Sequence, residues 1–359
     1  MSSPASPLRQ DIDRQPGILA AIWSRAGQFR RLAREHLKPG LGGRLFVAGC
    51  GDGLFAAQAA SAYAESLGLD WRAIGALDLL LSASSLRPAD RVLALSMSGN
   101  VDRTVEAAQA VAQRGLPMAA LVNGGGGRLA AIASAKVSLD IEDVAPFLCG
   151  TSSYTATVLA LMLMAQGAAG VDASMDLVSI GAAQSAALAA ADAGIGQIPL
   201  PTGVRLLAAG AERGTVRYGA AKFVELTRIP AWSGDLEEFA HSQYWAMPAS
   251  DLVVMVSPEP RLSRYADDSC DALRGLGVTT LAIDTLESPV PRATFRITVP
   301  KIDAALMPLV TALPLQLLAA HLARASGLDP DRRLHLKNDE ARFRVSRMLT
   351  RRSLLGTGQ

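Results

Sequence analysis

The sequence predicts an α/β protein with two doubly wound parallel sheets in tandem. Three observations carry this prediction. Short apolar runs typical of buried strands alternate with stretches whose apolar residues recur at helical spacing. The alternation occurs twice, before and after about residues 194–202. Half of the 359 residues are hydrophobic and only 5% are aromatic, which suits helices packed closely on parallel sheets.

The first half begins with a polar arm, residues 1–16, and an amphipathic helix over 18–36 with Ile18, Ile22 and Phe29 on one face. Strands are expected at 44–48, 71–74, 92–95, 117–122 and 136–139. Helices are expected over 54–67, from 101 to about 112, and as two long apolar segments at 151–166 and 176–193.

The second half repeats this pattern. It has expected strands at 204–208, 252–256 and 278–283, and helices at 215–228 and 302–325. We therefore expect an N-terminal arm and helix over 1–40, a first domain over 41–195, a second over 196–340 and a basic tail over 341–359.

Composition excludes several classes of protein. The net charge of +2 does not favour nucleic-acid binding, and three scattered cysteines make neither a disulfide framework nor a zinc cluster. The first residues lack the pattern of a secretory signal. The most apolar segment, 155–170, is interrupted by Gln166 and Gly167 and is short for a membrane span. We expect a cytoplasmic protein without a metal, a cofactor, a membrane or a nucleic-acid partner.

The first half contains a candidate anion site. The loop Ser96-Met97-Ser98-Gly99-Asn100 leaves an expected strand and opens an expected helix, where free N–H groups and the helix dipole favour an anion. An ordinary turn that caps a helix would look the same. A glycine-rich loop, 49–53, follows the first strand, whereas Ser257-Pro-Glu-Pro in the second half is unsuited to anions. One anion site per chain is expected.

Taken together, the motifs resemble a known family. The loop S-M-S-G-N-x-x-x-T, the earlier G-C-G-D-G, and G-A-A-K-F-V-E followed by E-E-F-A-H are similar to those of the double-domain sugar isomerase (SIS) family. Its members include the isomerase part of glucosamine-6-phosphate synthase and related sugar-phosphate isomerases and deaminases. The opening D-I-D-R-Q-P at 11–16 is also similar, and the resemblance covers residues 10–340. It implies two flavodoxin-like αβα sandwich domains.

The resemblance implies that Glu225 moves a proton between C1 and C2 of a sugar. A glutamate on a helix can serve as such a base if partial burial tunes its pKa. The alternative is a surface glutamate paired with Lys222 or Arg228.

His241 follows Glu225 by 16 positions, and the resemblance implies that it opens the sugar ring and reaches the neighbouring subunit's site. An imidazole titrates near neutral pH and suits that proton transfer. His36 and His321 are expected to be structural.

Lys337 matches a family lysine that lies over the sugar, where it would stabilise enediolate charge. Asn338 and His335 are alternatives for this position, as is a solvated surface lysine. Thr151 and Ser152 match hydroxyl residues that contact the sugar, and N-capping would explain them equally. The implied substrate-binding residues are Cys50, Gly51, Asp52, Gly53, Ser96, Met97, Ser98, Asn100, Val101, Thr104, Thr151 and Ser152.

The sequence departs from the family in four respects. Gly53 and Val101 stand where the family usually has hydroxyl residues, which predicts a phosphate bound more weakly than usual or a less charged head group. No amidotransferase domain precedes the isomerase part, which argues against an ammonia-channelling synthase. The arginine-rich tail after Glu340 is expected to be solvated or to contact an acidic partner or the other subunit.

These expectations define a homodimeric sugar isomerase, acting on a small-molecule sugar or sugar phosphate through an enediol or enediolate. An amino-sugar deaminase on the same scaffold is the first alternative. A non-catalytic sugar-sensing protein is the second.

Overall fold

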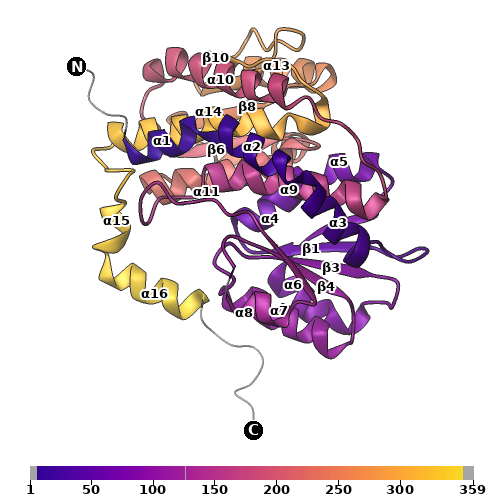
Figure 1. Cartoon of the computed structure of the whole chain (residues 1–359). Helices are drawn as coiled ribbons and strands as arrows, with labels where there is room; N and C mark the ends of the chain where they lie inside the picture. The colour runs from indigo at the N-terminus through magenta and orange to yellow at the C-terminus, as the bar shows by residue number, and fades with distance from the viewer. Residues whose placement is uncertain (1–5, 126, 351–359) are drawn as a thin grey trace. The chain divides into compact units, whose positions relative to one another are not determined.

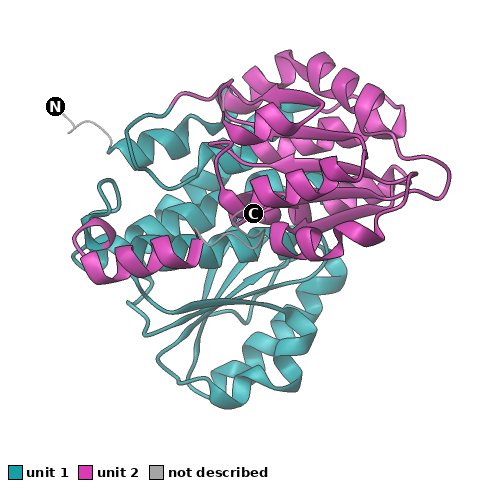
Figure 2. Ribbon diagram, turned by 90° about the horizontal axis from the view of Figure 1, so that it is seen from below, with its two compact units in different colours: residues 1–17, 143–155, 176–335 teal, residues 18–142, 156–175, 336–359 magenta. Residues whose placement is uncertain are grey.

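A computed structural model describes residues 6–125 and 127–350 of the chain (Figure 1). It divides into two compact units (Figure 2). Unit 1 comprises residues 1–17, 143–155 and 176–335, and unit 2 comprises 18–142, 156–175 and 336–359. The chain therefore passes between the units more than once. The division falls within helices α2 (Gln15–Ser24), α9 (Ser152–Ala169) and α15 (Leu334–Lys337).

Unit 2 contains a parallel sheet of five strands in the order β2-β1-β3-β4-β5. This order is that of flavodoxin-like folds. The strands are β1 (Leu45–Gly49), β2 (Trp71–Gly75), β3 (Arg91–Leu95), β4 (Met118–Val122) and β5 (Ala135–Ser138). The remaining helices that lie wholly in unit 2 are α3 (Ala26–His36), α4 (Asp52–Ala59), α5 (Ser61–Ser66), α6 (Ala76–Ser82), α7 (Asp102–Gln113), α8 (Arg128–Ile132) and α16 (Glu340–Thr350).

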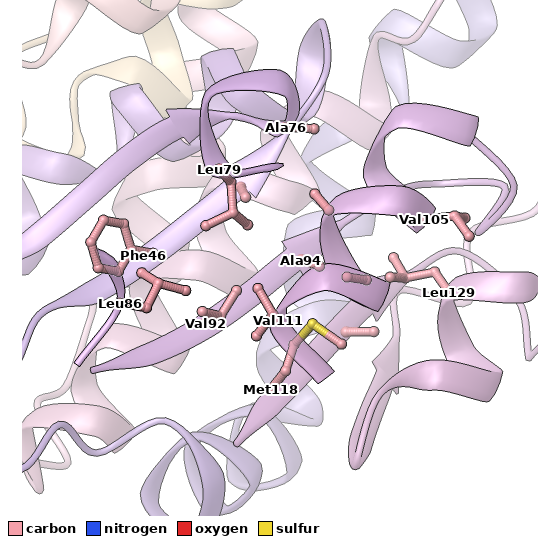
Figure 3. Close-up of a cluster of buried hydrophobic side chains, with 14 of the residues drawn as sticks. Phe46, Ala76, Leu79, Leu86, Val92, Ala94, Val105, Val111, Met118 and Leu129 are labelled. Carbon is pink, nitrogen blue, oxygen red and sulfur yellow. The ribbon is translucent and has the colours of Figure 1, made fainter. Parts of the chain in front are cut away.

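One face of this sheet carries the hydrophobic cluster drawn in Figure 3. Strands β1, β3 and β4 contribute Phe46, Val92 and Met118, which lie side by side in the register of the sheet. Helices α6 and α7 cover these side chains with Leu79 and Val111. Alanines fill much of the remaining space. Small side chains let helices approach a parallel sheet closely, which explains a composition rich in alanine and poor in aromatic residues.

Unit 1 contains a second parallel sheet, in the order β10-β9-β8-β6-β7. Counted from its own first strand, this is the same order as in unit 2, so the predicted tandem fold class is confirmed. The strands are β6 (Val204–Ala208), β7 (Ala231–Asp235), β8 (Leu252–Val256), β9 (Thr279–Asp284) and β10 (Phe295–Thr298). The helices that lie wholly in unit 1 are α1 (Pro7–Asp13), α10 (Leu177–Gly194), α11 (Glu212–Thr227), α12 (Leu236–His241), α13 (Pro260–Arg274) and α14 (Pro308–Ala325).

Helix α11 packs tightly in unit 1 at Gly219. A Cβ there would lie 2.8 Å from the terminal methyl carbons of Leu206 and Leu315, so a larger residue would require these side chains of β6 and α14 to shift. By length and composition, the segments Leu177–Gln197 and Ala304–Ala325 could cross a membrane. The second of these is 83% buried, as expected of a core helix.

The structure corrects several predicted element boundaries. The helix predicted over 18–36 is two helices that meet at Arg25, whose guanidinium donates to the carbonyl oxygens of Ser138 and Leu139. Residues 54–67 form α4 and α5, and the final long helix begins at Pro308 rather than at 302. The edge strands β7 and β10 escaped prediction because half-exposed edge strands lack a continuous apolar run. Residues 341–350 of the predicted tail belong to helix α16, which begins at Glu340, and the rest of the tail lies outside the described residues.

A buried carboxyl lies in the first turn of α11. Glu212 is only 3% exposed, and its Oε2 atom accepts a hydrogen bond of 2.7 Å from the Thr311 hydroxyl. Burial raises the pKa of Glu212 to about 7, and the nearby charge of Glu259 acts in the same direction. Glu212 is therefore substantially protonated in the folded protein near neutral pH.

Glu212 should make stability depend on pH. A carboxyl that holds its proton more tightly when folded stabilises the fold at low pH, and this stabilisation is lost as pH rises from about 4.5 to about 7. For Glu212→Gln we expect a flatter pH profile and, at pH 8, a free energy of unfolding higher by roughly 1 to 3 kcal/mol. Urea unfolding from pH 5 to 8 measures this. Glu238→Gln, an exposed control on α12, should keep the wild-type slope; an unchanged slope in Glu212→Gln would contradict the assignment.

Candidate functional site

The two loops expected to bind an anion lie together in unit 2. Strands β1 and β3 are parallel neighbours, so the loops that follow them leave the same edge of the sheet. The Thr104 hydroxyl of α7, the helix that the second loop opens, lies 3.7 Å from the sulfur of Cys50 in the glycine-rich loop. Ser96 is 5% exposed, and its hydroxyl has no hydrogen-bond partner in the described part of the chain. A buried hydroxyl left in this condition suits a ligand oxygen.

The loop after β4 contacts residues 96–100, here called the serine loop, and fixes their conformation. A Cβ on Gly127 would lie 2.7 Å from the Gly99 Cα atom, so the loop after β4 rests directly on the serine loop. The Arg128 guanidinium donates to the Asn100 carbonyl oxygen at 2.7 Å, and the Arg128 N–H donates to the Asn100 side chain at 3.1 Å. The serine loop is therefore held in place in the absence of a ligand.

Helix α7 begins directly after this loop without a side-chain cap. Val101 occupies the N-cap position, where it offers no acceptor to the first N–H groups of the helix. These N–H groups and the helix dipole remain suited to an anion. Val101 therefore lacks the hydroxyl that the family usually has at this position, and for the same reason it cannot cap α7 with its side chain.

Glu225 lies near the end of α11 in unit 1, beside a buried cation. The Lys222 ammonium is 3.0 Å from both carboxylate oxygens of Glu225, and the Lys222 side chain is 2% exposed against 35% for Glu225. A buried lysine needs a counter-charge, so the pair is held together more firmly than an exposed surface pair. The alternative partner Arg228 instead donates to the His335 carbonyl oxygen.

Arg333 was not expected near Glu225 from the sequence. Its Nη1 atom lies 3.5 Å from Glu225 Oε2, and its side chain is 11% exposed. His335, an alternative to Lys337, places Nε2 at 3.0 Å from the Glu225 carbonyl oxygen and must donate there. Its buried Nδ1 has no partner among the described residues. No local motif pointed to Arg333, because its neighbours are more than 100 positions away in sequence.

The other two predicted catalytic residues are His241 and Lys337. His241 ends α12, where its Nε2 atom is 3.0 Å from Glu237 Oε1 and both side chains are more than half exposed. Hydrogen bonds from Tyr265 and His241 lower the pKa of Glu237. Lys337 ends α15 and belongs to unit 2, whereas Glu225 belongs to unit 1. The roles of both residues stay predictions.

Thr151 and Ser152 bond to the N-terminal arm. The hydroxyls of both residues donate to the carboxylate of Asp11, as does the Ser152 N–H at 3.0 Å. Asp11 is 5% exposed and pairs with Arg14 at 2.6 Å. The hydroxyl protons of Thr151 and Ser152 are therefore committed to Asp11, and only their oxygen lone pairs remain for a ligand.

The same network explains the D-I-D-R-Q-P opening. Gln15 is fully buried and donates to Gln316 at 2.7 Å, and it accepts from the Thr155 hydroxyl at 2.8 Å. Gln316 in turn donates to the Tyr218 hydroxyl at 3.1 Å. The motif therefore joins α9 and α14 to α11, the helix that carries Glu225.

Asp11 should matter far more than its neighbour Asp13. Asp11→Asn removes the charge that Arg14 pairs with and leaves one oxygen to accept bonds that two now accept. We expect a loss of about 1 to 3 kcal/mol in the free energy of unfolding. Asp13→Asn is the matched control, since Asp13 forms an exposed pair with Arg9 and should cost below about 1 kcal/mol. Equal losses in urea titrations of the two variants would show that the network carries no special weight.

Among the described residues, no group of three or more His, Cys, Asp and Glu side chains is arranged to hold a metal ion. Unit 2 offers hydroxyl and backbone N–H donors, and unit 1, described by itself, offers a carboxylate with two cations.

Comparison with known proteins places this arrangement in a family. The model of the SIS domain matches residues 42–166 and 204–325, more than half of the chain. The chain belongs to the SIS domain family. The match occurs twice along the chain, as the repeated sheet order requires.

Two curated relatives of this SIS protein are isomerizing glutamine–fructose-6-phosphate aminotransferases. The one from Thermococcus kodakarensis is 27% identical over 118 residues, and the one from Thermosynechococcus vestitus is 29% identical over 115 residues. The matched regions cover 33% and 32% of this chain but only 20% and 18% of the relatives.

Solved structures share the fold over nearly the whole chain. Glucosamine-6-phosphate deaminase from Thermotoga maritima has a TM-score of 0.76 at 19% identity, covering 91% of this chain and 97% of that one. Tagatose-6-phosphate ketose/aldose isomerase from Escherichia coli has a TM-score of 0.74 at 20% identity, covering 91% and 95%. At these identities the likeness shows the fold alone.

Proposed function

We propose that this SIS protein is an aldose–ketose isomerase that acts on a sugar phosphate by proton transfer, without a metal. The pairing of the Glu225 carboxylate with buried Lys222 supports this most directly. The base would take the proton from C2 of the open-chain aldose and leave an enediolate with its charge on O1. Transfer of the O2 proton to O1 and return of the first proton to C1 then give the ketose.

The serine and glycine loops of unit 2 support a phosphate head group. Ser96 and Ser98, with the N–H groups that open α7, supply neutral donors that suit a dianion. Gly53 and Val101 supply no side-chain donor, so we propose a phosphate bound more weakly than a full set of hydroxyls would allow. A carboxylate, sulfonate or hydroxymethyl group in its place is the alternative that matched substrates would test.

Glu225 should be indispensable for turnover. Glu225→Gln keeps the shape of the side chain and removes the basic oxygen, so we expect kcat to fall about 10² to 10⁴-fold with KM little changed. Deuterium uptake from solvent at C2 of candidate sugar phosphates measures the proton transfer, with Glu238→Gln as the control. Release of ammonia from amino sugars would instead indicate a deaminase, and sugar binding without exchange a sensor. Unchanged exchange in Glu225→Gln would rule Glu225 out as the base.

We also propose that the protein acts as a homodimer in which His241 serves the partner subunit's site. The exposure of His241 on α12 supports this, because an exposed residue is accessible to a second chain. Mixing inactive Glu225→Gln chains with inactive His241→Ala chains should then restore part of the activity, since some mixed dimers have one site with both groups intact. Mixtures no more active than either parent would place both groups in the same chain's site.

A further inference from the structure

Strained backbone gathers around Glu225. In the described chain, four residues other than glycine have a positive φ, and three of them are Phe147 at 70°, Arg228 at 59° and Arg333 at 48°. Arg228 caps α11 three residues after Glu225, and Arg333 contacts the Glu225 carboxylate. Phe147 bonds to Arg333. Such conformations each cost of the order of 1 to 3 kcal/mol and cluster where function requires a fixed geometry.

Two of the strained residues bond to each other, and the third bonds to His335. The Arg333 guanidinium lies 4.4 Å above the Phe147 ring, and its Nε and Nη2 atoms both donate to the Phe147 carbonyl oxygen, the first at 2.8 Å. Arg228 donates to the His335 carbonyl oxygen, while the His335 ring donates to the Glu225 carbonyl oxygen at 3.0 Å. Hydrogen bonds therefore hold segment 333–335 against the end of α11. Phe147 holds the Arg333 guanidinium through its carbonyl oxygen and its ring.

This arrangement makes the two oxygens of Glu225 unequal. Lys222 lies 3.0 Å from both of them, whereas Arg333 approaches only Oε2, at 3.5 Å. Oε1 therefore keeps more of its lone-pair capacity than Oε2. A proton would go to the oxygen with fewer donors around it.

We infer that Arg333 is a positioning residue for the proton transfer: it fixes Oε2 of Glu225 and leaves Oε1 to take the proton. The inference rests on the proposed function and extends it. When the C2 proton passes to Oε1, the negative charge of the carboxylate moves to the sugar as an enediolate. The charges of Lys222 and Arg333, until then balanced in part by Glu225, become available to stabilise it.

The chain offers a matched control beside Arg333. Arg332 is exposed, so Arg332→Gln changes the same kind of residue outside the contact with Glu225. We expect Arg333→Gln to lower kcat about 10 to 100-fold with KM changed less than about 3-fold, because misplacing a base affects the transition state more than binding. Arg333→Lys should recover part of the loss, and Arg332→Gln should match the wild type.

Chemical rescue separates positioning from mere folding. Arg333→Ala leaves a gap beside Phe147, and added guanidinium ion at millimolar concentration should restore kcat saturably in this variant but not in Glu225→Gln. Thermal unfolding of each variant reports on folding independently of activity. If Arg333→Ala does not fold, Arg333→Lys and Arg333→Gln carry the test through their difference in kcat.

The outcomes for the two proposals are distinct. An active wild type, an inactive Glu225→Gln and a fully active Arg333→Gln would overturn the inference about Arg333 and leave the proposed function in place. Equal loss of kcat in Arg333→Lys and Arg333→Gln, with no guanidinium rescue of Arg333→Ala, would also overturn it. A wild type that exchanges no proton with any sugar phosphate would overturn both.

Discussion

All strands of the two sheets run parallel, and this constraint determines where function can reside. Parallel neighbours must be joined by crossovers, so every strand ends at the same edge of its sheet and the following loop opens toward a helix. The serine and glycine loops owe their proximity to this register between β1 and β3. Glu225 lies near the far end of the crossover helix that follows β6, and long-range bonds fix it there.

Three buried ionisable groups of unit 1 differ in how their charge is balanced. Lys222 is buried beside Glu225, which balances its charge and is itself partly exposed, so that a ligand could reach the carboxylate. Asp11 accepts several hydrogen bonds and pairs with Arg14, so its charge is balanced structurally. Glu212 accepts a hydrogen bond from the Thr311 hydroxyl, and desolvation by burial raises its pKa. Only the first of these leaves a carboxylate suited to act as a base.

Segments far apart in sequence meet around α11. Residues of the N-terminal arm, of segment 143–155, of α14 and of segment 333–335 contact one another or α11 within unit 1. Many of these contacts are hydrogen bonds to backbone carbonyl oxygens or between buried amide side chains, and such bonds are strongly directional. The residues with a costly positive φ take part in these contacts: Arg333 bonds to Phe147, and Arg228 bonds to the carbonyl oxygen of His335.

The sequence by itself determined the tandem α/β class, the central strands and the candidate loops, because these depend on local apolar periodicity and on small residues at strand ends. It also singled out Glu225 through its motif. It did not reveal the edge strands β7 and β10, whose exposed residues carry no apolar signal, nor the breaks at Arg25 and Pro308 within expected helices. Only the tertiary structure decided that Asp11 takes the hydroxyl protons of Thr151 and Ser152, and that Arg333 approaches Oε2 of Glu225. Those contacts join residues more than 100 positions apart, and no local pattern encodes such a distance.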